Sequence, residues 1–183
     1  AEYTIRRFSL PESREEIVQE WYQMAEDAYR YRVPLKDGAK EWLQWLRKRK
    51  IPLAVATSSD EKLFEPALKR TGIYDYFDTF VTVKEVARGK GFPDIYEEAA
   101  ARISLAPGQC VVFEDILAGI RGAKLGGFCA VAVYDEDSAD DEQSLRSEAD
   151  HYIYHYRQLL EGTPKFFSFT ENNFQTHSGV CPE

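Results

Sequence analysis

The first fifty residues carry apolar side chains at the spacing of amphipathic helices. One helix is predicted from Glu12 to Tyr31 and a second from about Gly38 to Lys50. Pro34 separates them, because the residue before a proline disfavours the helical conformation. The apolar stripe of the first helix comprises Ile17, Val18, Trp21, Tyr22, Met24, Ala25, Ala28, Tyr29 and Tyr31. A stripe this broad requires packing partners.

From Pro52 onward the pattern changes to short apolar runs, each followed by a helical stretch. The runs predict strands at 52–57, 79–83, 110–113 and 128–133, and the alternation from His151 to Tyr156 predicts a last edge strand. Helices are predicted from Asp60 to Thr71, from Asp94, from about Leu117 and after residue 133. Strands that alternate with helices predict an α/β fold with a mainly parallel sheet, covered by helices on both faces.

The composition narrows the class of protein. The 183 residues fit one main domain, and 44% of them are hydrophobic, which is enough for a buried core. The formal net charge of −8, from 31 acidic and 23 basic residues, gives no electrostatic reason to expect DNA, RNA or an anionic membrane as partner. We therefore expect no nucleic acid and no membrane partner, and a small molecule as the ligand.

The cysteines and the apolar segments favour a cytoplasmic protein. Cys110, Cys129 and Cys181 are odd in number and lack a C-x-x-C spacing, which favours neither a disulfide framework nor a zinc site. No stretch approaches the roughly 20 apolar residues that span a bilayer, and the first residues lack the apolar run of a signal peptide. His151 and His155 are four apart, but their alternation with tyrosines predicts a strand, not a helical metal site.

Polar side chains follow the first two predicted strands, where the ligand site of an open parallel sheet lies. Thr57 ends the first strand and Ser58 follows it, and their hydroxyls and amides at a helix start suit a phosphoryl oxygen. The alternative is that these residues cap the next helix. Lys90 lies between two glycines after the second strand, where a lysine can pair with phosphoryl charge. The alternative is a solvated loop lysine.

Two carboxylates, Glu114 and Asp115, follow the third predicted strand directly. Because adjacent residues of a strand point to opposite sides, at most one of them binds a cation directly, and its neighbour acts through water or backbone. Oxygen ligands without a nearby histidine or cysteine suit Mg²⁺. The sequence therefore predicts Mg²⁺ as the cofactor.

Three segments, PLAVATSS, GKGFPDIY and VVFEDILAGI, occur in this order. They closely resemble motifs two, three and four of the haloacid dehalogenase-like superfamily, in the branch that contains β-phosphoglucomutase and small-molecule phosphatases. The resemblance covers about Pro34 to Leu160. It implies a Rossmann-like three-layer core domain over 34–162, a remnant of a helical cap domain over 1–33 and a C-terminal tail over 163–183.

The resemblance also implies a role for each matching residue. Thr57 would bind the phosphoryl group together with Ser58, and Lys90 would neutralise the nucleophile and the phosphate. Asp115 would ligate Mg²⁺, and Glu114 would support the metal indirectly. The family usually has proline at the position of Gly91 and a small polar residue at the position of Ile116, but neither departure removes a catalytic group.

The family's first motif has no counterpart before Thr57. That motif is an Asp-x-Asp pair on the first strand, which supplies the nucleophile and the acid/base. The chain starts with Ala1 and not with methionine, so we expect it to start inside the cap, to be inactive alone, and to belong to a protein with an upstream segment. In the family's sheet this first strand lies at the centre, between the strands that would end here at Thr57 and Phe113. Its loss would leave these two inner strands without partners, at about 1–3 kcal/mol for each unpaired buried backbone group.

One other Asp-x-Asp pair, Asp135 and Asp137, follows an apolar run, and a permuted protein could use it as the nucleophile. Against this, the family's Gly-Thr does not follow, and the segment lies where the family's next strand belongs.

The sequence thus predicts a Mg²⁺-dependent phosphohydrolase or phosphomutase that acts on a small phosphorylated metabolite, such as a sugar phosphate, through an aspartyl-phosphate. The alternative is a catalytically inactive truncated relative that serves as a phosphate- or metal-binding module or as a protein-interaction module. A nicotinamide-binding protein is disfavoured, since no G-x-G-x-x-G follows any predicted strand.

Overall fold

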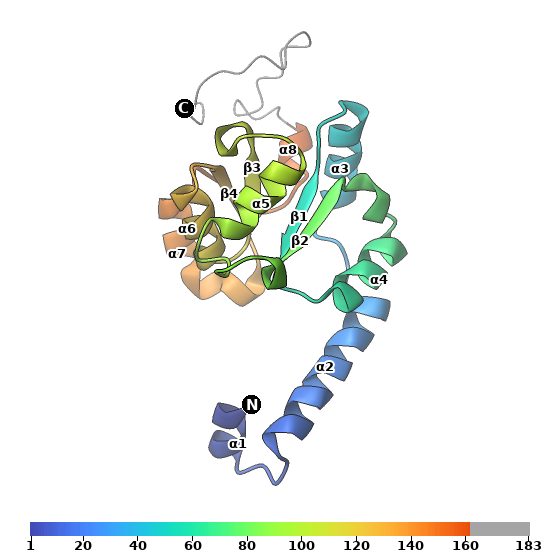
Figure 1. Ribbon diagram of the computed structural model, residues 1–183, viewed down its shortest axis with the longest axis vertical. Coiled ribbons are helices and arrows are strands. Elements are labelled where there is room, and N and C mark those ends of the chain that lie inside the picture. Colours follow the sequence, from blue (N-terminus) through green and yellow to red (C-terminus); the bar gives the residue numbers. More distant parts are fainter. Residues whose placement is uncertain (162–183) are drawn as a thin grey trace. The chain divides into compact units, whose positions relative to one another are not determined.

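The computed structural model describes residues 1–161, in which helices and strands alternate along most of the sequence (Figure 1). The helices are α1 (Glu2–Phe8), α2 (Arg14–Tyr31), α3 (Ala39–Lys48), α4 (Glu61–Thr71), α5 (Asp94–Arg102), α6 (Leu117–Leu125), α7 (Glu142–Glu148) and α8 (Gln158–Glu161). The strands are β1 (Ala54–Thr57), β2 (Thr79–Thr82), β3 (Val111–Glu114), β4 (Cys129–Val133) and β5 (His151–Ile153). The tail predicted over 163–183 lies outside the described residues.

The helix ends follow from local sequence. Helix α2 begins after Ser13, whose hydroxyl accepts a hydrogen bond from the Glu16 amide while the Glu16 carboxylate accepts one from the Ser13 amide. Helix α4 ends where predicted, because Gly72 follows it with a left-handed φ of 71°. Helix α1 is not predicted by the sequence analysis, and none of its residues is buried. No helix within residues 1–161 is long and apolar enough to cross a bilayer.

The strands form two parallel groups. Strand β1 pairs with β2, with Thr57 opposite Thr82, and β3 pairs with β4, with Glu114 opposite Ala132. Strand β5 adds to the outer edge of β4 and ends at Ile153, earlier than predicted. In the described part of the chain, β1 and β3 each have one hydrogen-bonded neighbour and do not pair with each other. Parallel strands joined by helices confirm the predicted α/β class.

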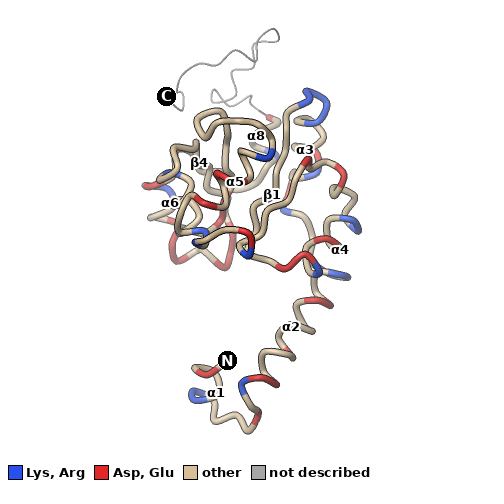
Figure 2. Tube along the Cα trace, in the orientation of Figure 1, with Lys and Arg blue, Asp and Glu red and all other residues tan. Residues whose placement is uncertain are grey.

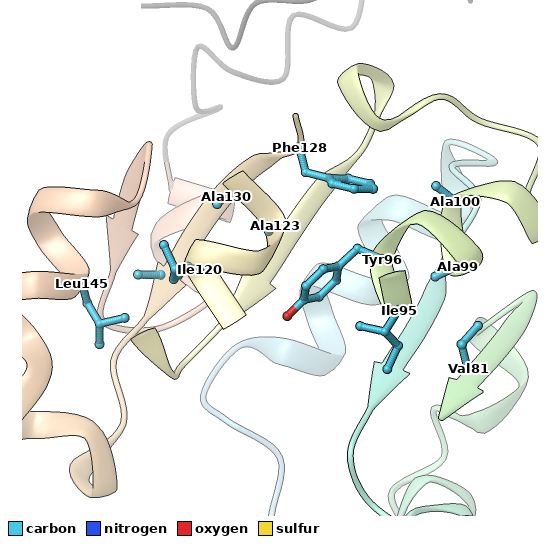
Figure 3. Packing of buried hydrophobic residues seen from close by; sticks show 11 residues of the cluster. Val81, Ile95, Tyr96, Ala99, Ala100, Ile120, Ala123, Phe128, Ala130 and Leu145 are labelled. Carbon is cyan, nitrogen blue, oxygen red and sulfur yellow. The ribbon is translucent and has the colours of Figure 1, made fainter. Parts of the chain in front are cut away.

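Two apolar clusters cover opposite faces of these strands. One contains residues of α5 and α6 and the inward side chains of β2 and β4 (Figure 3). The other contains residues of α3 and α8. Along β4, Ala130 and Ala132 join the first cluster and Val131 and Val133 join the second, as the period of two requires. The strands therefore lie between two helical layers, in the predicted three-layer arrangement.

The chain divides into two compact units. The first comprises Ala1–Pro34 and Asp60–Tyr74, and within it α2 packs against α4. Trp21 and Met24 of the predicted apolar stripe remain exposed there. The second comprises Leu35–Ser59 and the described residues from Asp75 onward. Every residue of the predicted site lies in this second unit.

At the carboxyl end of β2, Glu85 makes hydrogen bonds that depend on its negative charge. Glu85 accepts hydrogen bonds from the Thr82 amide at 2.7 Å and from Arg102 Nη2 at 2.7 Å, which lower its pKa to about 2. The unfolded chain takes up this proton near pH 4.5. The stability that Glu85 contributes is thus present above pH 4.5 and is lost as the pH falls through about 2.

Replacement of Glu85 with glutamine should therefore flatten the loss of stability in this acid range. At neutral pH the cost should stay below about 1 kcal/mol, because the side chain is partly exposed and screened. Urea unfolding at a series of pH values measures both quantities. Parallel pH profiles for the variant and the parent protein would contradict the assignment.

Candidate active site

The predicted site residues lie at or just after the carboxyl ends of three strands. Thr57 is the last residue of β1 and Ser58 follows it, Lys90 lies in the loop between β2 and α5, and Glu114 is the last residue of β3, with Asp115 next in the chain. The position of Glu114 inside the strand differs from the prediction, which ended the strand at residue 113. Its side chain is therefore held by the sheet itself.

Lys90 and Glu114 form a partly buried ion pair. Lys90 Nζ donates to Glu114 Oε1 at 2.6 Å, and the Tyr96 hydroxyl of α5 donates to the same oxygen at 2.9 Å. Glu114 is 6% exposed and Tyr96 is 3% exposed. Burial and the Glu114 carboxylate raise the pKa of Tyr96, so its hydroxyl stays protonated and remains a donor. The Lys90 side chain is thus held at the end of β3 and is 18% exposed, unlike a freely solvated loop lysine.

Two glycines of α6 leave the space that this arrangement needs. A Cβ atom added at Gly119 would lie 2.7 Å from Glu114 Cδ. At Gly122 it would lie 2.0 Å from the Lys90 carbonyl oxygen and 2.8 Å from that of Phe92. Helix α6 therefore packs directly on the backbone that carries Lys90, at a distance that only glycine permits.

Asp115, the first residue after β3, is the more exposed of the two carboxylates. Its side chain is 39% exposed and lies 3.6 Å from Lys36 Nζ, measured to Oδ2. Lys36 belongs to the loop before α3 and also donates to the Tyr134 carbonyl at 3.2 Å. Asp115 therefore faces solvent and a lysine, while Glu114 faces the protein interior.

Asp135, the candidate nucleophile of a permuted protein, makes structural contacts. Its Oδ2 accepts from Lys36, and its Oδ1 accepts from the Asp137 amide at 3.0 Å at the start of a short 3-10 helix, η4 (Glu136–Asp141). The hydrogen bond from Lys36 lowers the pKa of Asp135. The acidic run that follows lies in η4 and the first residue of α7, coloured red in Figure 2.

Thr57 and Ser58 do not cap helix α4. The N-cap is Asp60, whose carboxylate accepts from the Lys62 amide at 3.2 Å. The Thr57 hydroxyl accepts from the Ser59 amide at 3.0 Å and so turns the chain immediately after β1. Within residues 1–161, no hydrogen bond or ion pair joins Thr57 or Ser58 to the three charged residues of the site.

The donor set at the end of β3 fits part of a Mg²⁺ site. Asp115 offers a partly exposed carboxylate, and Mg²⁺ commonly binds one or two carboxylates and keeps several waters. Among residues 1–161, no group of three or more His, Cys, Asp or Glu side chains comes close enough to hold a metal ion, and this includes His151 and His155. The described residues therefore supply one ligand and not a complete site.

The sequence analysis assigned no role to Tyr96, Lys36, Gly119 or Gly122. Tyr96 lies in the GKGFPDIY segment, and a hydroxyl on the buried face of a helix was an available signal. Lys36 is separated by 99 residues from Asp135, so no local pattern relates the two. Gly119 belongs to the VVFEDILAGI segment and Gly122 follows that segment, but the atoms that the two glycines approach depend on how α6 packs.

Comparisons with known proteins identify relatives. Residues 4–127 match the model of a family described as haloacid dehalogenase-like hydrolase. Validoxylamine A 7'-phosphate phosphatase of Streptomyces hygroscopicus is 37% identical over 114 residues, which are 62% of this chain and 52% of that protein. Fructose-1-phosphate phosphatase YqaB of Escherichia coli is 38% identical over 101 residues, 55% of this chain and 51% of that protein. The chain thus spans about half the length of the curated relatives it matches.

A crystal structure of β-phosphoglucomutase from Clostridium difficile has the same fold, with a TM-score of 0.66 and 21% identity over 86% of this chain and 68% of that one. The family model covers more than half of the chain and includes the strand ends that carry Thr57, Lys90 and Asp115. The chain therefore belongs to the haloacid dehalogenase-like hydrolase family.

Proposed function

We propose that the complete protein is a Mg²⁺-dependent phosphohydrolase or phosphomutase that acts on a small phosphorylated metabolite through an aspartyl-phosphate. The observation that carries this proposal is the buried pair of Lys90 and Glu114 beside the partly exposed Asp115. A lysine held by a buried carboxylate is fixed in position, and phosphoryl transfer depends mainly on such positioning and on charge neutralisation. The geometry thus supports an anionic, phosphate-bearing ligand.

In this proposal each residue has one task. Lys90 neutralises the phosphoryl group and the attacking carboxylate, and the Thr57 hydroxyl and the Ser58 amide and hydroxyl bind phosphoryl oxygens. Asp115 ligates Mg²⁺, and Glu114 holds Lys90 in place. Bound Mg²⁺ supplies further charge neutralisation for the phosphoryl oxygens.

The nucleophilic aspartate is proposed to come from a strand outside this chain. Strands β1 and β3 each lack a second neighbour among the described residues, and both end at the predicted site. A parallel strand inserted between them would satisfy both ladders and would bring its carboxyl end between Thr57 and Glu114. This placement puts an Asp-x-Asp motif beside Lys90.

The substrate class is proposed from the relatives. Two of them are named as phosphatases of validoxylamine A 7'-phosphate and of fructose 1-phosphate, which are both phosphorylated carbohydrates or carbohydrate-like molecules. A sugar phosphate is accordingly the first substrate to test. The segment 1–33, which contains α2, is the proposed remnant of the cap that selects it.

The test compares this chain with the complete gene product in an assay with Mg²⁺ and a generic aryl phosphate. We expect turnover by the complete protein and none by residues 1–183 alone. Turnover by the chain alone would mean that the nucleophile lies within it. No turnover by either protein, on the aryl phosphate or on a panel of sugar phosphates, would favour an inactive module that binds phosphate, metal or protein partners.

Replacement of Asp115 with asparagine should weaken the apparent Mg²⁺ affinity of the complete protein by about 10²-fold, because one charged ligand is lost. The fold should survive, since Asp115 is exposed and its contact with Lys36 is a partly solvated ion pair. The dependence of rate on Mg²⁺ concentration measures the change. Replacement of Asp137, which lies in the 3-10 helix η4, with asparagine serves as the control and should leave the Mg²⁺ dependence unaltered. An unchanged Mg²⁺ dependence in the Asp115 variant would refute its assignment as ligand.

A further inference from the structure

Lys36 lies between two carboxylates at the carboxyl ends of β3 and β4. Its Nζ is 3.6 Å from Asp115 Oδ2, donates to the Tyr134 carbonyl at 3.2 Å and also donates to Asp135 Oδ2. The side chains of Lys36, Asp115 and Asp135 are 34%, 39% and 31% exposed, so ions from solvent can reach all three. The single positive charge of Lys36 thus lies beside two carboxylates, so these three side chains together carry a net charge of −1.

The backbone that carries Lys36 is anchored to the segment after β5. The carbonyl of Asp37 accepts from the Tyr156 amide at 2.9 Å, and the Asp37 carboxylate pairs with Arg157 at 2.9 Å. Gly38 has φ 74° and lies so close to this segment that an added Cβ atom would be 2.4 Å from the Arg157 nitrogen. The ammonium therefore extends from a fixed base toward the two carboxylates.

We propose that Lys36 is the counter-cation of the metal-free site. It neutralises Asp115 when no divalent ion is present, competes with the ion for that carboxylate, and stays on Asp135 once the ion binds. This inference rests on the proposed function, in which Asp115 ligates Mg²⁺. Lys36 belongs to the loop that precedes α3 and therefore lies outside the three sequence motifs.

The charges explain why the two cations exclude each other. A Mg²⁺ ion binds a carboxylate oxygen at about 2.0–2.1 Å. An ammonium held close to the same carboxylate would face two positive charges at short range, where repulsion is strong even in a solvated site. Asp135 already accepts a hydrogen bond from Lys36, so the ammonium keeps a partner when it leaves Asp115.

The proposal predicts that replacements of Lys36 and of Asp135 change the divalent-ion affinity in opposite directions. Replacement of Lys36 with glutamine removes the competing charge but keeps hydrogen-bond donors for Asp135 and Tyr134, so divalent-ion affinity should rise by about twofold to fivefold. Replacement of Asp135 with asparagine leaves Lys36 to Asp115 alone, so the affinity should fall by a similar factor. Replacement of Lys36 with arginine keeps the charge and should change the affinity less than either variant.

The experiment titrates the complete gene product with Mn²⁺ and follows the free-ion signal by electron paramagnetic resonance, which requires no turnover. Parent protein and variants are compared at about 0.02 M and about 0.5 M salt, and the differences should shrink at high salt because exposed charges are screened. Cooperative thermal unfolding of each variant verifies its fold. If the glutamine variant does not fold, methionine at position 36 replaces it in the same test.

If Lys36 had only a structural role, its replacement by a neutral residue would not raise the Mn²⁺ affinity. Loosening of the loop would leave Mn²⁺ affinity unchanged or lower in the neutral Lys36 variants, and that result would overturn the proposal. The Asp115→Asn variant distinguishes a failure of the proposed ligand, Asp115, from a failure of the proposed role of Lys36. If it binds Mn²⁺ as tightly as the parent protein, the assigned ligand and the role of Lys36 both fail. If it binds weakly but the neutral Lys36 variants do not bind more tightly, only the role of Lys36 fails.

Discussion

Replacement of Lys90 with methionine is expected to lower the turnover of the complete protein by about 10³-fold and to destabilise its fold by about 3 kcal/mol. The first effect follows from the loss of the positive charge that faces the transferred phosphoryl group. The second follows because Glu114 would keep its buried negative charge without the ammonium at 2.6 Å. Steady-state kinetics and urea unfolding measure the two effects separately.

A double variant distinguishes these roles of Lys90. With methionine at position 90 and glutamine at position 114, no buried charge is left unpaired, and the amide can still accept from Tyr96. We expect most of the stability to return while turnover remains low. If turnover returned together with stability, Lys90 would have only a structural role, and the proposed neutralisation of phosphate would be wrong.

Replacement of Gly122 with alanine is expected to destabilise the protein by about 3 kcal/mol and to reduce turnover by about 10²-fold. Alanine would improve the helix propensity of α6 by about 1 kcal/mol. The added methyl, however, would lie 2.0 Å from the Lys90 carbonyl oxygen, and a backbone atom has no rotamer by which to move away. The overpacking therefore outweighs the propensity, and the loop that carries Lys90 must shift.

The glycines on either side of Lys90 provide the matched controls. A Cβ atom at Gly89 or Gly91 would meet no atom within 4 Å, and neither residue has a positive φ. Alanine at either position should alter stability by less than about 0.5 kcal/mol. Equal losses at Gly91 and Gly122 would show that the loop itself needs glycine and that contact with α6 is not the cause.

The order and type of the elements could be predicted because each is specified locally. The apolar runs that became β1, β3 and β4 contrast with the flanking polar helices, and Gly72 ends α4 through a property of its own backbone. The association of site residues with strand ends was also predictable, since Lys90, Glu114 and Asp115 follow apolar runs. Domain limits over 1–33 and 34–162 stay predictions, and the structure groups α4 with the N-terminal helices.

The partners within the site could not be predicted, because they depend on packing between distant segments. Lys90 and Glu114 are 24 residues apart, and their contact requires α6 to approach the Lys90 backbone. The sequence drew attention to the glycines beside Lys90, whereas the crowded positions are in α6. The alternative role of Thr57 and Ser58 as caps of α4 is wrong, because Asp60, three residues beyond Thr57, has a side chain suited to the task and caps the helix.

The inner edges of β1 and β3 have a consequence for how this chain behaves in solution. Both strands are short and uncharged before Glu114, and among residues 1–161 each pairs with a single parallel neighbour, so its other edge presents a row of backbone donors and acceptors. Such edges are templates for pairing with strands of other molecules. We therefore expect these edges to make the chain prone to aggregation unless another strand pairs with them.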